Sequence, residues 1–454
     1  MKVKKFMFVL MGTMLVFSSC SDSELGNGED GRGTEQSATN SPLVNVYADE
    51  DCSEASLLAG DILLKEGATR TLTLNAPIHA DKVYMKYNTA SGGEATKTFA
   101  LTPVARSGGV GFSYATSQKA SVTLALPEDA VKPTSETDAG YLFYHNTGVA
   151  MFEDGWPTKP ASWYDEDFND VVFEYDLKVT ECQDAAQMEK QGSKEELLIT
   201  LDVRAMGGQN PTVLGVILEG LDSKYIDRIT ASLQLKGGQG TMTELAKKDF
   251  SSDATVVVEK RDWNWKNQTV NRYSKLTVDK TPVEGTIITL DGLSTLKEND
   301  GKFFQVTPGF IKEGLEMVRA EVRLIGKEGL TGAERTAQLE AFRELILNTN
   351  RQNFFIKTAH GIEIHMKGYA PTSAYQEKYK ELVAKDSELD ANIPYTNVDG
   401  YTWGVKVPVG ARHAFENISF AEAYTEFTEW IDSNGASNKG WYLKPDAEKT
   451  VRYW

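Results

Sequence analysis

The sequence predicts a mainly β protein, with an N-terminal β-sandwich domain followed by a larger antiparallel β-domain that contains two inserted helices. Short apolar runs with a period of two residues recur along most of the chain, and clusters of Gly, Pro, Ser and Asp separate them. The 454 residues include 41% hydrophobic and 25% charged residues, which is typical of a folded globular chain. This composition excludes a disordered or a collagen-like protein.

The charge of the chain restricts its classes of partner. It has 48 Lys and Arg against 65 Asp and Glu, which gives a formal net charge of −17 at pH 7. Nucleic-acid binding depends on clustered Lys and Arg side chains that displace counterions from phosphates, and no basic stripe runs through this sequence. The charge therefore argues against a nucleic-acid partner and favours cations.

The N-terminus predicts secretion and lipid attachment. Residues 1–19 contain three lysines, an apolar run from Phe6 to Phe17 and two serines, which describes a signal peptide rather than a membrane span. The VFSSC sequence that ends at Cys20 resembles the lipobox of bacterial lipoproteins, in which the cysteine becomes the acylated first residue. That resemblance implies a membrane anchor at Cys20, whereas a plain signal peptide would leave the thiol unmodified.

Residues 20–42 are predicted to be an acidic, disordered tether. The segment has five acidic residues, one arginine and almost no apolar residue, so it cannot bury a core. Acidic residues directly after an acylated cysteine resemble the export signals that place some lipoproteins on the outer face of the outer membrane. We therefore expect a lipid-anchored protein at the outer membrane or cell surface.

Residues 43–135 are predicted to fold as the β-sandwich domain. Alternating apolar residues occur in TLTLN (71–75), KVYMKY (82–87) and SVTLAL (121–126), and turns rich in Ser and Gly separate the runs. The Pro- and acid-containing stretch 127–140 marks the end of this domain.

Residues 140–454 are predicted to form the larger β-domain. Period-two alternation continues at 197–203, 318–324 and 362–366, with longer loops between the strands. Two amphipathic segments predict helices. The first begins at Thr331 with Glu334 in capping-box spacing, and the second begins at Ser373. We expect both helices to pack against the sheets.

The segment 141–176 concentrates acidic side chains between apolar flanks. Asp165, Asp167, Asn169 and Asp170 fall within six residues, and Asp154 lies upstream in a turn. Carboxylates this close repel one another unless a cation lies among them, and calcium takes about six to eight such oxygen ligands. The sequence therefore predicts a structural calcium site at these five residues, although turn carboxylates that cap backbone amides would produce the same pattern. An EF-hand is excluded, because Asp170 stands where that loop requires glycine.

The same segment resembles a known family. FEDGWP at 152–157, DEDFNDVV at 165–172 and EYD at 174–176 resemble the signature of the LruC-domain family of bacterial outer-membrane lipoproteins, whose usual form is FEDxWP followed by DYDFNDLVV. Further matches follow in family order at 353–372, 403–435 and 440–445. The resemblance implies one domain from residue 141 to 454, a lipoprotein setting and added support for calcium. It brings no established activity.

If Cys20 is lipidated, two cysteines remain in the chain, and secretion would place them in an oxidising compartment. Cys52 and Cys182 could close a disulfide that joins the first domain to the second, or they could be two separate buried thiols. Two cysteines are too few for a Cys-rich zinc module.

The sequence contains little evidence of a catalytic site. No G-x-S-x-G elbow, Walker loop or H-E-x-x-H motif occurs, and five histidines provide little general-base material. We therefore predict a non-enzymatic cell-envelope lipoprotein that acts in surface binding or scaffolding, with structural calcium as its cofactor.

A glycan-binding or glycan-active protein is the alternative. Trp263 and Trp265 lie among polar residues in RDWNWKNQ and would share a face of an extended chain, where they could stack on sugar rings. The competing interpretation is that they anchor a hairpin on the sheet. The predicted partner is accordingly a glycan or a protein at the cell surface.

Overall fold

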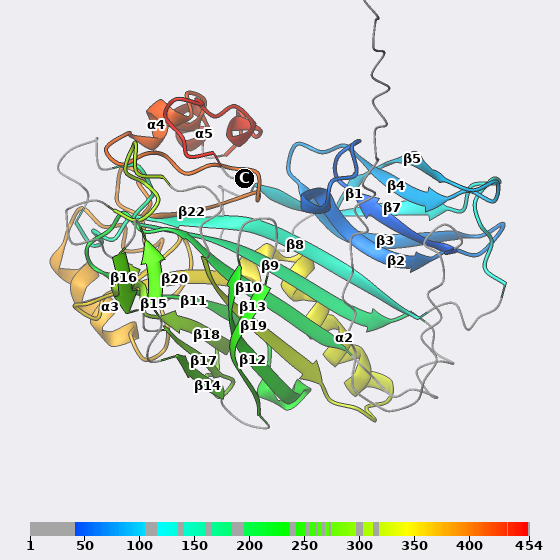
Figure 1. Ribbon diagram of the computed structural model, residues 1–454, viewed down its shortest axis with the longest axis horizontal. Coiled ribbons are helices and arrows are strands. Elements are labelled where there is room, and N and C mark those ends of the chain that lie inside the picture. Colours follow the sequence, from blue (N-terminus) through cyan, green and yellow to red (C-terminus); the bar gives the residue numbers. More distant parts are fainter. Residues whose placement is uncertain are drawn as a thin grey trace, which may run out of the picture. The chain divides into compact units, whose positions relative to one another are not determined.

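A sheet of eleven antiparallel strands includes strands from both predicted domains (Figure 1). The computed structural model describes residues 41–104, 116–134, 140–158, 166–183, 195–236, 242–250, 254–258, 262–265, 268–271, 274–296, 303–311, 317–433 and 435–452. The order across the sheet is β13 (Met242–Phe250), β12 (Ile226–Lys236), β19 (Met317–Gly326), β10 (Glu196–Ala205), β9 (Val171–Cys182), β8 (Tyr141–Phe152), β2 (Leu57–Leu63), β1 (Leu43–Tyr47), β4 (Lys82–Asn88) and β5 (Glu94–Ala100), and β22 (Gly404–Val407) also pairs with β8. Strand β2 pairs with β8 at Ala59 and Tyr144, so strands from both sides of the predicted domain boundary are hydrogen-bonded to each other.

Three smaller sheets complete the described β-structure. A six-stranded sheet has the order β14 (Ala254–Val258), β17 (Ser274–Asp279), β18 (Gly285–Asp291), β11 (Pro211–Glu219), β20 (Gln352–Thr358) and β21 (Glu363–His365). A three-stranded sheet joins β3 (Thr69–Pro77), β7 (Ser117–Ala125) and β6 (Thr102–Pro103), and a hairpin joins β15 (Asp262–Trp265) to β16 (Gln268–Asn271). The prediction of a mainly antiparallel β fold is confirmed.

Strand β9 shows why these residues form a sheet with one buried face. It pairs with β8 in continuous register from Tyr141–Cys182 to Phe152–Val171. Because side chains alternate between the two faces of a strand, its apolar residues share the face that is turned to the core. The fully buried residues of that face are Phe173, Tyr175, Leu177 and Val179.

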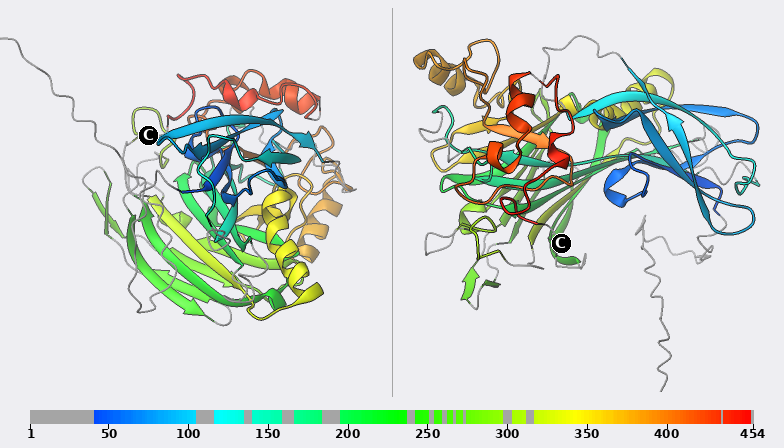
Figure 2. Two further views of the ribbon diagram at one scale, coloured as in Figure 1. Left: turned by 90° about the vertical axis from the view of Figure 1, so that its right-hand side faces the viewer. Right: turned by 90° about the horizontal axis from the view of Figure 1, so that it is seen from above.

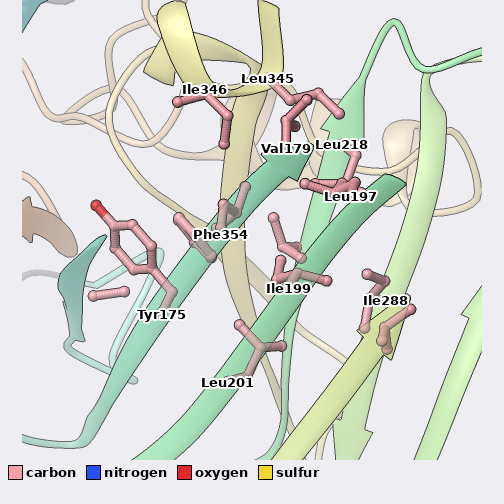
Figure 3. Packing of buried hydrophobic residues seen from close by; sticks show 14 of the residues in the cluster. Tyr175, Val179, Leu197, Ile199, Leu201, Leu218, Ile288, Leu345, Ile346 and Phe354 are labelled. Carbon is pink, nitrogen blue, oxygen red and sulfur yellow. The ribbon is translucent and has the colours of Figure 1, made fainter. Parts of the chain in front are cut away.

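The two large sheets pack face to face around this row of side chains. Figure 3 shows Tyr175 of β9 and Ile199 of β10 turned toward Phe354 of β20 and Ile288 of β18. The rings of Tyr175 and Phe354 have centroids 4.4 Å apart. Each large apolar side chain buried in this way stabilises the fold by about 1.5–3 kcal/mol, so the sandwich is held chiefly by its interior.

Four α-helices lie in the described part of the chain: α2 (Gly332–Leu347), α3 (Gln376–Lys385), α4 (Phe420–Ala423) and α5 (Phe427–Asp432). The first two confirm the predicted helices. Helix α2 covers one end of the sandwich, where Leu345 and Ile346 are buried beside Val179 (Figure 3). Its N-cap residue Thr331 makes no side-chain capping hydrogen bond, so the spacing identified the helix although the capping box itself does not form.

Neither Cys52 nor Cys182 forms a disulfide in the described structure, which agrees with the second of the two alternatives, separate thiols. Cys182 ends β9 opposite Tyr141, whereas Cys52 lies in the turn that precedes β2, with its Sγ 3.9 Å from the hydroxyl of Thr96 on β5. Strands β8, β2, β1 and β4 separate β9 from β5 in the sheet. A disulfide requires α-carbons within about 7 Å, and these two cysteines lie in different parts of the sheet.

The predicted N-terminal signals lie outside the described residues. These signals are the signal peptide 1–19, the lipidation site Cys20 and the tether 20–42, of which only residues 41 and 42 are described. Among the helices of the described part, none is both long enough and apolar enough to cross a membrane.

Candidate functional site

The acidic loop, defined as residues 166–170, connects the turn after β8 to the start of β9. It follows the FEDGWP turn, in which the Trp156–Pro157 peptide bond is cis. The loop contains three of the predicted calcium ligands: Asp167, Asn169 and Asp170. Asp154 lies in the preceding turn, and the fifth, Asp165, lies outside the described residues.

Asp154 and Asp170 join the loop to the chain after β10. The main-chain N–H of Asp154 donates to Oδ2 of Asp170 at 2.6 Å. The Asp154 carboxylate accepts from the main-chain N–H of Asn210 at 3.0 Å and from the side-chain amide of Asn210 at 3.2 Å. The main-chain N–H of Gly208 donates to the carbonyl of Asp170 at 3.1 Å. These contacts fix three chain segments to one another.

Asp167 and Asn169 join the loop to the C-terminal region. Asp167 is 3% exposed and accepts main-chain N–H groups from Asn169 and Asn417, both at 3.1 Å. The Asn169 amide donates to the carbonyl of Ala414 at 3.3 Å. Burial raises the pKa of the Asp167 carboxyl well above its ordinary value, and the nearby carboxylates of Glu416 and Asp170 raise it further. The ionised form of Asp167 is therefore disfavoured unless positive charge is supplied.

Glu153 and Phe168 hold the centre of the loop in place. Glu153 is 2% exposed, and its carboxylate accepts the main-chain N–H of Phe168. Phe168 has a φ of 53°, which is unusual for a bulky residue and costs energy. Its buried ring packs against Phe420 and Phe427, with centroids 5.4 and 6.1 Å away. The conformation is thus maintained by an aromatic cluster contributed by α4 and α5.

The carboxylates of Asp154, Asp167 and Asp170 accept hydrogen bonds from amides. The structure brings Asp154 beside Asp170 and places Asp167 within electrostatic range of Asp170. Among the described residues, no group of three His, Cys, Asp or Glu side chains is arranged to hold a metal ion. The arrangement matches the interpretation in which turn carboxylates cap backbone amides, and a metal would have to recruit Glu416 or main-chain oxygens.

Several residues of this site were missed by sequence analysis. Asn417 donates to Asp167 of the loop, Glu416 acts on Asp167 electrostatically, and Asn210 donates to Asp154 in the preceding turn. Gly207 also belongs here, because its main-chain N–H donates to the carbonyl of Asn169 at 2.8 Å and a Cβ at Gly207 would collide with the Asn169 amide. No local motif marks any of these four residues, so only the fold reveals them.

The predicted tryptophan platform lies on the β15–β16 hairpin. Trp263 pairs with Val270 and Trp265 pairs with Gln268, so the backbone at both tryptophans is extended, as predicted. Their side chains lie outside the described part of the structure. The hairpin forms a two-stranded sheet of its own.

Comparison with known proteins gives two matches. Residues 195–442 match a family model described as a domain of unknown function, DUF4842. The fold is similar to the crystal structure of a putative lipoprotein from Bacteroides ovatus, with a TM-score of 0.85 and 66% sequence identity over 91% of this chain and 100% of that chain. No curated protein matches the chain.

Proposed function

Because the chain belongs to the DUF4842 family, and because it resembles a bacterial lipoprotein over most of its length, we propose that it is a cell-envelope lipoprotein anchored through Cys20. The observation that carries this proposal is the lipobox-like VFSSC sequence at 16–20, in a chain that is 66% identical to a putative lipoprotein. The LruC resemblance of the acidic segment agrees with the same setting and is part of the proposal.

Palmitate labelling tests the anchor. The wild-type protein should incorporate labelled palmitate, and Cys20→Ala should abolish incorporation because the acylated thiol is removed. Cys52→Ala is the matched control, because that cysteine lies in a turn of the folded domain. Labelling that persists in Cys20→Ala would refute the anchor.

We propose that the anchored domain binds or scaffolds partners at the cell surface rather than catalysing a reaction. Its extended sheets and buried interior provide a rigid support, and the sequence has no recognised catalytic motif. Protease treatment of whole cells tests the outer-face display that the tether predicts. Digestion without lysis is the expected result, and protection until lysis would place the domain inside the envelope.

We further propose that calcium stabilises the acidic loop. The buried Asp167 carboxylate lies within electrostatic range of the half-buried carboxylates of Asp170 and Glu416, and a cation near them would remove their repulsion. Thermal unfolding in calcium and then in chelator provides the test. Ligand linkage predicts a rise in Tm of several degrees when calcium exceeds its Kd about 100-fold.

A double variant decides whether the acidic loop is responsible for a calcium effect. Asp167→Asn with Asp170→Asn should remove the rise in Tm, whereas Asp227→Asn on the surface of β12 should leave it intact. A Tm that calcium does not change, or a rise in Tm that the double variant retains, would refute the calcium proposal. The acidic side chains would then act only as caps of main-chain amides.

Glycan binding is a second candidate function, supported by the extended β15–β16 hairpin that carries Trp263 and Trp265. A glycan array with the wild type and with Trp263→Ala/Trp265→Ala tests it. Binding by the wild type and loss in the variant are expected, because aromatic faces stack on sugar rings. Failure of the wild type to bind any glycan would exclude this candidate.

A further inference from the structure

A cavity of about 550 Å³ lies where the N-terminal strands meet the larger domain. Its volume is within the range of about 300–1,000 Å³ that small-molecule sites occupy. The N-terminal side contributes residues 48–49, 53, 55–58, 75–77, 79 and 116–117, and the opposite side includes 145–147, 404–410, 442–443 and Arg412. Figure 2 shows the C-terminal helical segment beside the N-terminal strands, and Tyr442 bridges the two by bonding its hydroxyl to Nδ1 of His79 at 2.8 Å.

The lining of this cavity is cationic, in contrast to the acidic chain as a whole. Lys367 and Arg412 supply positive charge to the lining, which also contains Lys406 and two histidines, whereas Asp49 is the one carboxylate among the described lining residues. The Asp49 carboxylate is already engaged, because it accepts from the main-chain N–H and the hydroxyl of Ser53 at 3.1 and 2.6 Å. In a protein with a net charge of −17, this local excess of positive charge favours an anion.

Two of the basic groups in the lining serve the fold. The Lys406 ammonium donates to the carbonyl of Thr349 at 2.6 Å, and burial lowers its pKa to about 7. His145 bonds Nδ1 to the carbonyl of Leu57 and Nε2 to Asp176, both at 2.9 Å. These groups link the walls of the cavity, so we assign them no direct role in binding.

Arg412 differs from those groups. The Tyr424 hydroxyl accepts from the main-chain N–H of Arg412 and donates to its carbonyl, both at 2.8 Å, which fixes the backbone. Its guanidinium makes no hydrogen bond or ion pair with any residue that the structure describes, and the side chain is only half-buried. A guanidinium with five donors is suited to bind a carboxylate or phosphate in bidentate fashion.

His79 provides a second donor in the same cavity. Although His79 is partly exposed, desolvation lowers the pKa of its ring, and burial raises the pKa of the Tyr442 hydroxyl. At neutral pH the ring is therefore neutral and the phenol keeps its proton. In the tautomer in which Nδ1 accepts from the Tyr442 hydroxyl, the ring proton lies on Nε2, and the proposal takes this tautomer. That N–H has no hydrogen-bond partner within the described structure, so it is available to a ligand oxygen.

We propose that this cavity binds a small organic anion, with Arg412 holding its carboxylate or phosphate group and His79 donating to a second oxygen. The volume of the cavity, the positive charge of its lining and the two side chains without a further partner in the described structure support this assignment. The site is independent of calcium at the acidic loop and of the tryptophan hairpin. A sugar acid and a sugar phosphate share this chemistry, and they are distinguished by direct titration.

Calorimetric titration of the mature protein with glucuronate, glucose 6-phosphate and glucose tests the proposal. At least one of the two anions should bind, and uncharged glucose should not. Binding of glucuronate alone assigns a carboxylate ligand, and binding of glucose 6-phosphate alone assigns a phosphate ligand. Absence of binding by both anions, or equal binding of glucose, would overturn the proposal.

Three arginine variants locate the site. Arg412→Gln should weaken anion binding about tenfold or more, because a charge-assisted pair is lost. Arg412→Lys, which keeps the charge and loses the bidentate geometry, should show an intermediate affinity. Arg228→Gln removes the same charge from an exposed position on β12 and should bind like the wild type. Full affinity in Arg412→Gln, or an equal loss in Arg228→Gln, would overturn the assignment.

Discussion

The acidic loop and the cationic cavity use polar side chains in opposite ways. At the loop, the carboxylates of Asp167 and Asp170, together with that of Asp154 in the preceding turn, accept hydrogen bonds from main-chain amides that other segments supply. In the cavity, the Arg412 guanidinium and Nε2 of His79 make no hydrogen bond to any described residue. Acceptors that satisfy buried amides stabilise a fold, whereas donors left open in a cavity are available to a ligand.

This difference shows that a dense cluster of charge in the sequence does not by itself identify a binding site. The acids of the loop lie within a few residues of one another, yet they accept hydrogen bonds from amides inside the protein. The cavity residues come from segments that are far apart in the chain, and they meet only where the N-terminal strands pack against the larger domain. If the loop side chains stabilise the fold and the cavity side chains are free to bind a ligand, substitutions in the loop should reduce stability more than substitutions in the cavity.

The largest expected effect on stability comes from adding a side chain in the space beside the loop. Gly207→Ala would place a Cβ against the Asn169 amide, so it should lower the free energy of unfolding by about 3 kcal/mol. Gly410→Ala is the control, because Gly410 lines the cavity and a Cβ added there would meet no heavy atom within 4 Å. The Gly410→Ala substitution should change the free energy of unfolding by less than about 0.5 kcal/mol. Urea unfolding measures both, and equal midpoints would contradict a tightly packed loop.

Removal of one charge from each region should give a smaller contrast. Asp154→Ala leaves the Asn210 amides without their acceptor and should cost about 2 kcal/mol of unfolding free energy. Arg412→Ala should cost less than about 0.5 kcal/mol, since its guanidinium has no partner in the described structure. Chemical denaturation of the two variants checks this order, and a larger loss in Arg412→Ala would show that the cavity arginine is structural.

Much of the fold could be predicted from the sequence, because alternation and helical spacing are local signals. The period-two pattern from Val171 to Cys182 identified a strand, and the spacing from Thr331 identified helix α2 within about one residue. Pairing between distant strands has no such local signal. The β2–β8 contact that joins the N-terminal strands to the large sheet could therefore not be predicted.

The candidate sites could be predicted only in part for the same reason. Asp154, Asp167 and Asp170 were identified by their charge and spacing, but their amide partners at Asn210 and Asn417 were not, because those partners depend on tertiary packing. The cavity was not predicted at all. His79 and Arg412 are isolated residues in the sequence, and their shared environment arises when the C-terminal segment packs beside the N-terminal strands.

The smallest expected effect concerns His145 in the cavity. Like the loop carboxylates, its side chain is hydrogen-bonded to groups of the protein itself. Burial tends to lower the pKa of His145, but the Asp176 carboxylate and the hydrogen bonds to Asp176 and Leu57 raise it above the ordinary value. His145 in turn lowers the pKa of Asp176, against the effect of burial. The ion pair is therefore complete between the lowered pKa of Asp176 and the raised pKa of His145.

A raised histidine pKa contributes stability that is fully present below about pH 6.5 and is lost as the pH rises through the folded-state value. His145→Gln should therefore destabilise the protein more at pH 6 than at pH 9, with a difference on the order of 1 kcal/mol. Urea unfolding at the two pH values measures it, and Asp176→Asn should show the same pattern because it removes the partner charge. A loss that is equal at both pH values would mean that His145 acts as a neutral hydrogen-bonding group and not as the partner of an ion pair.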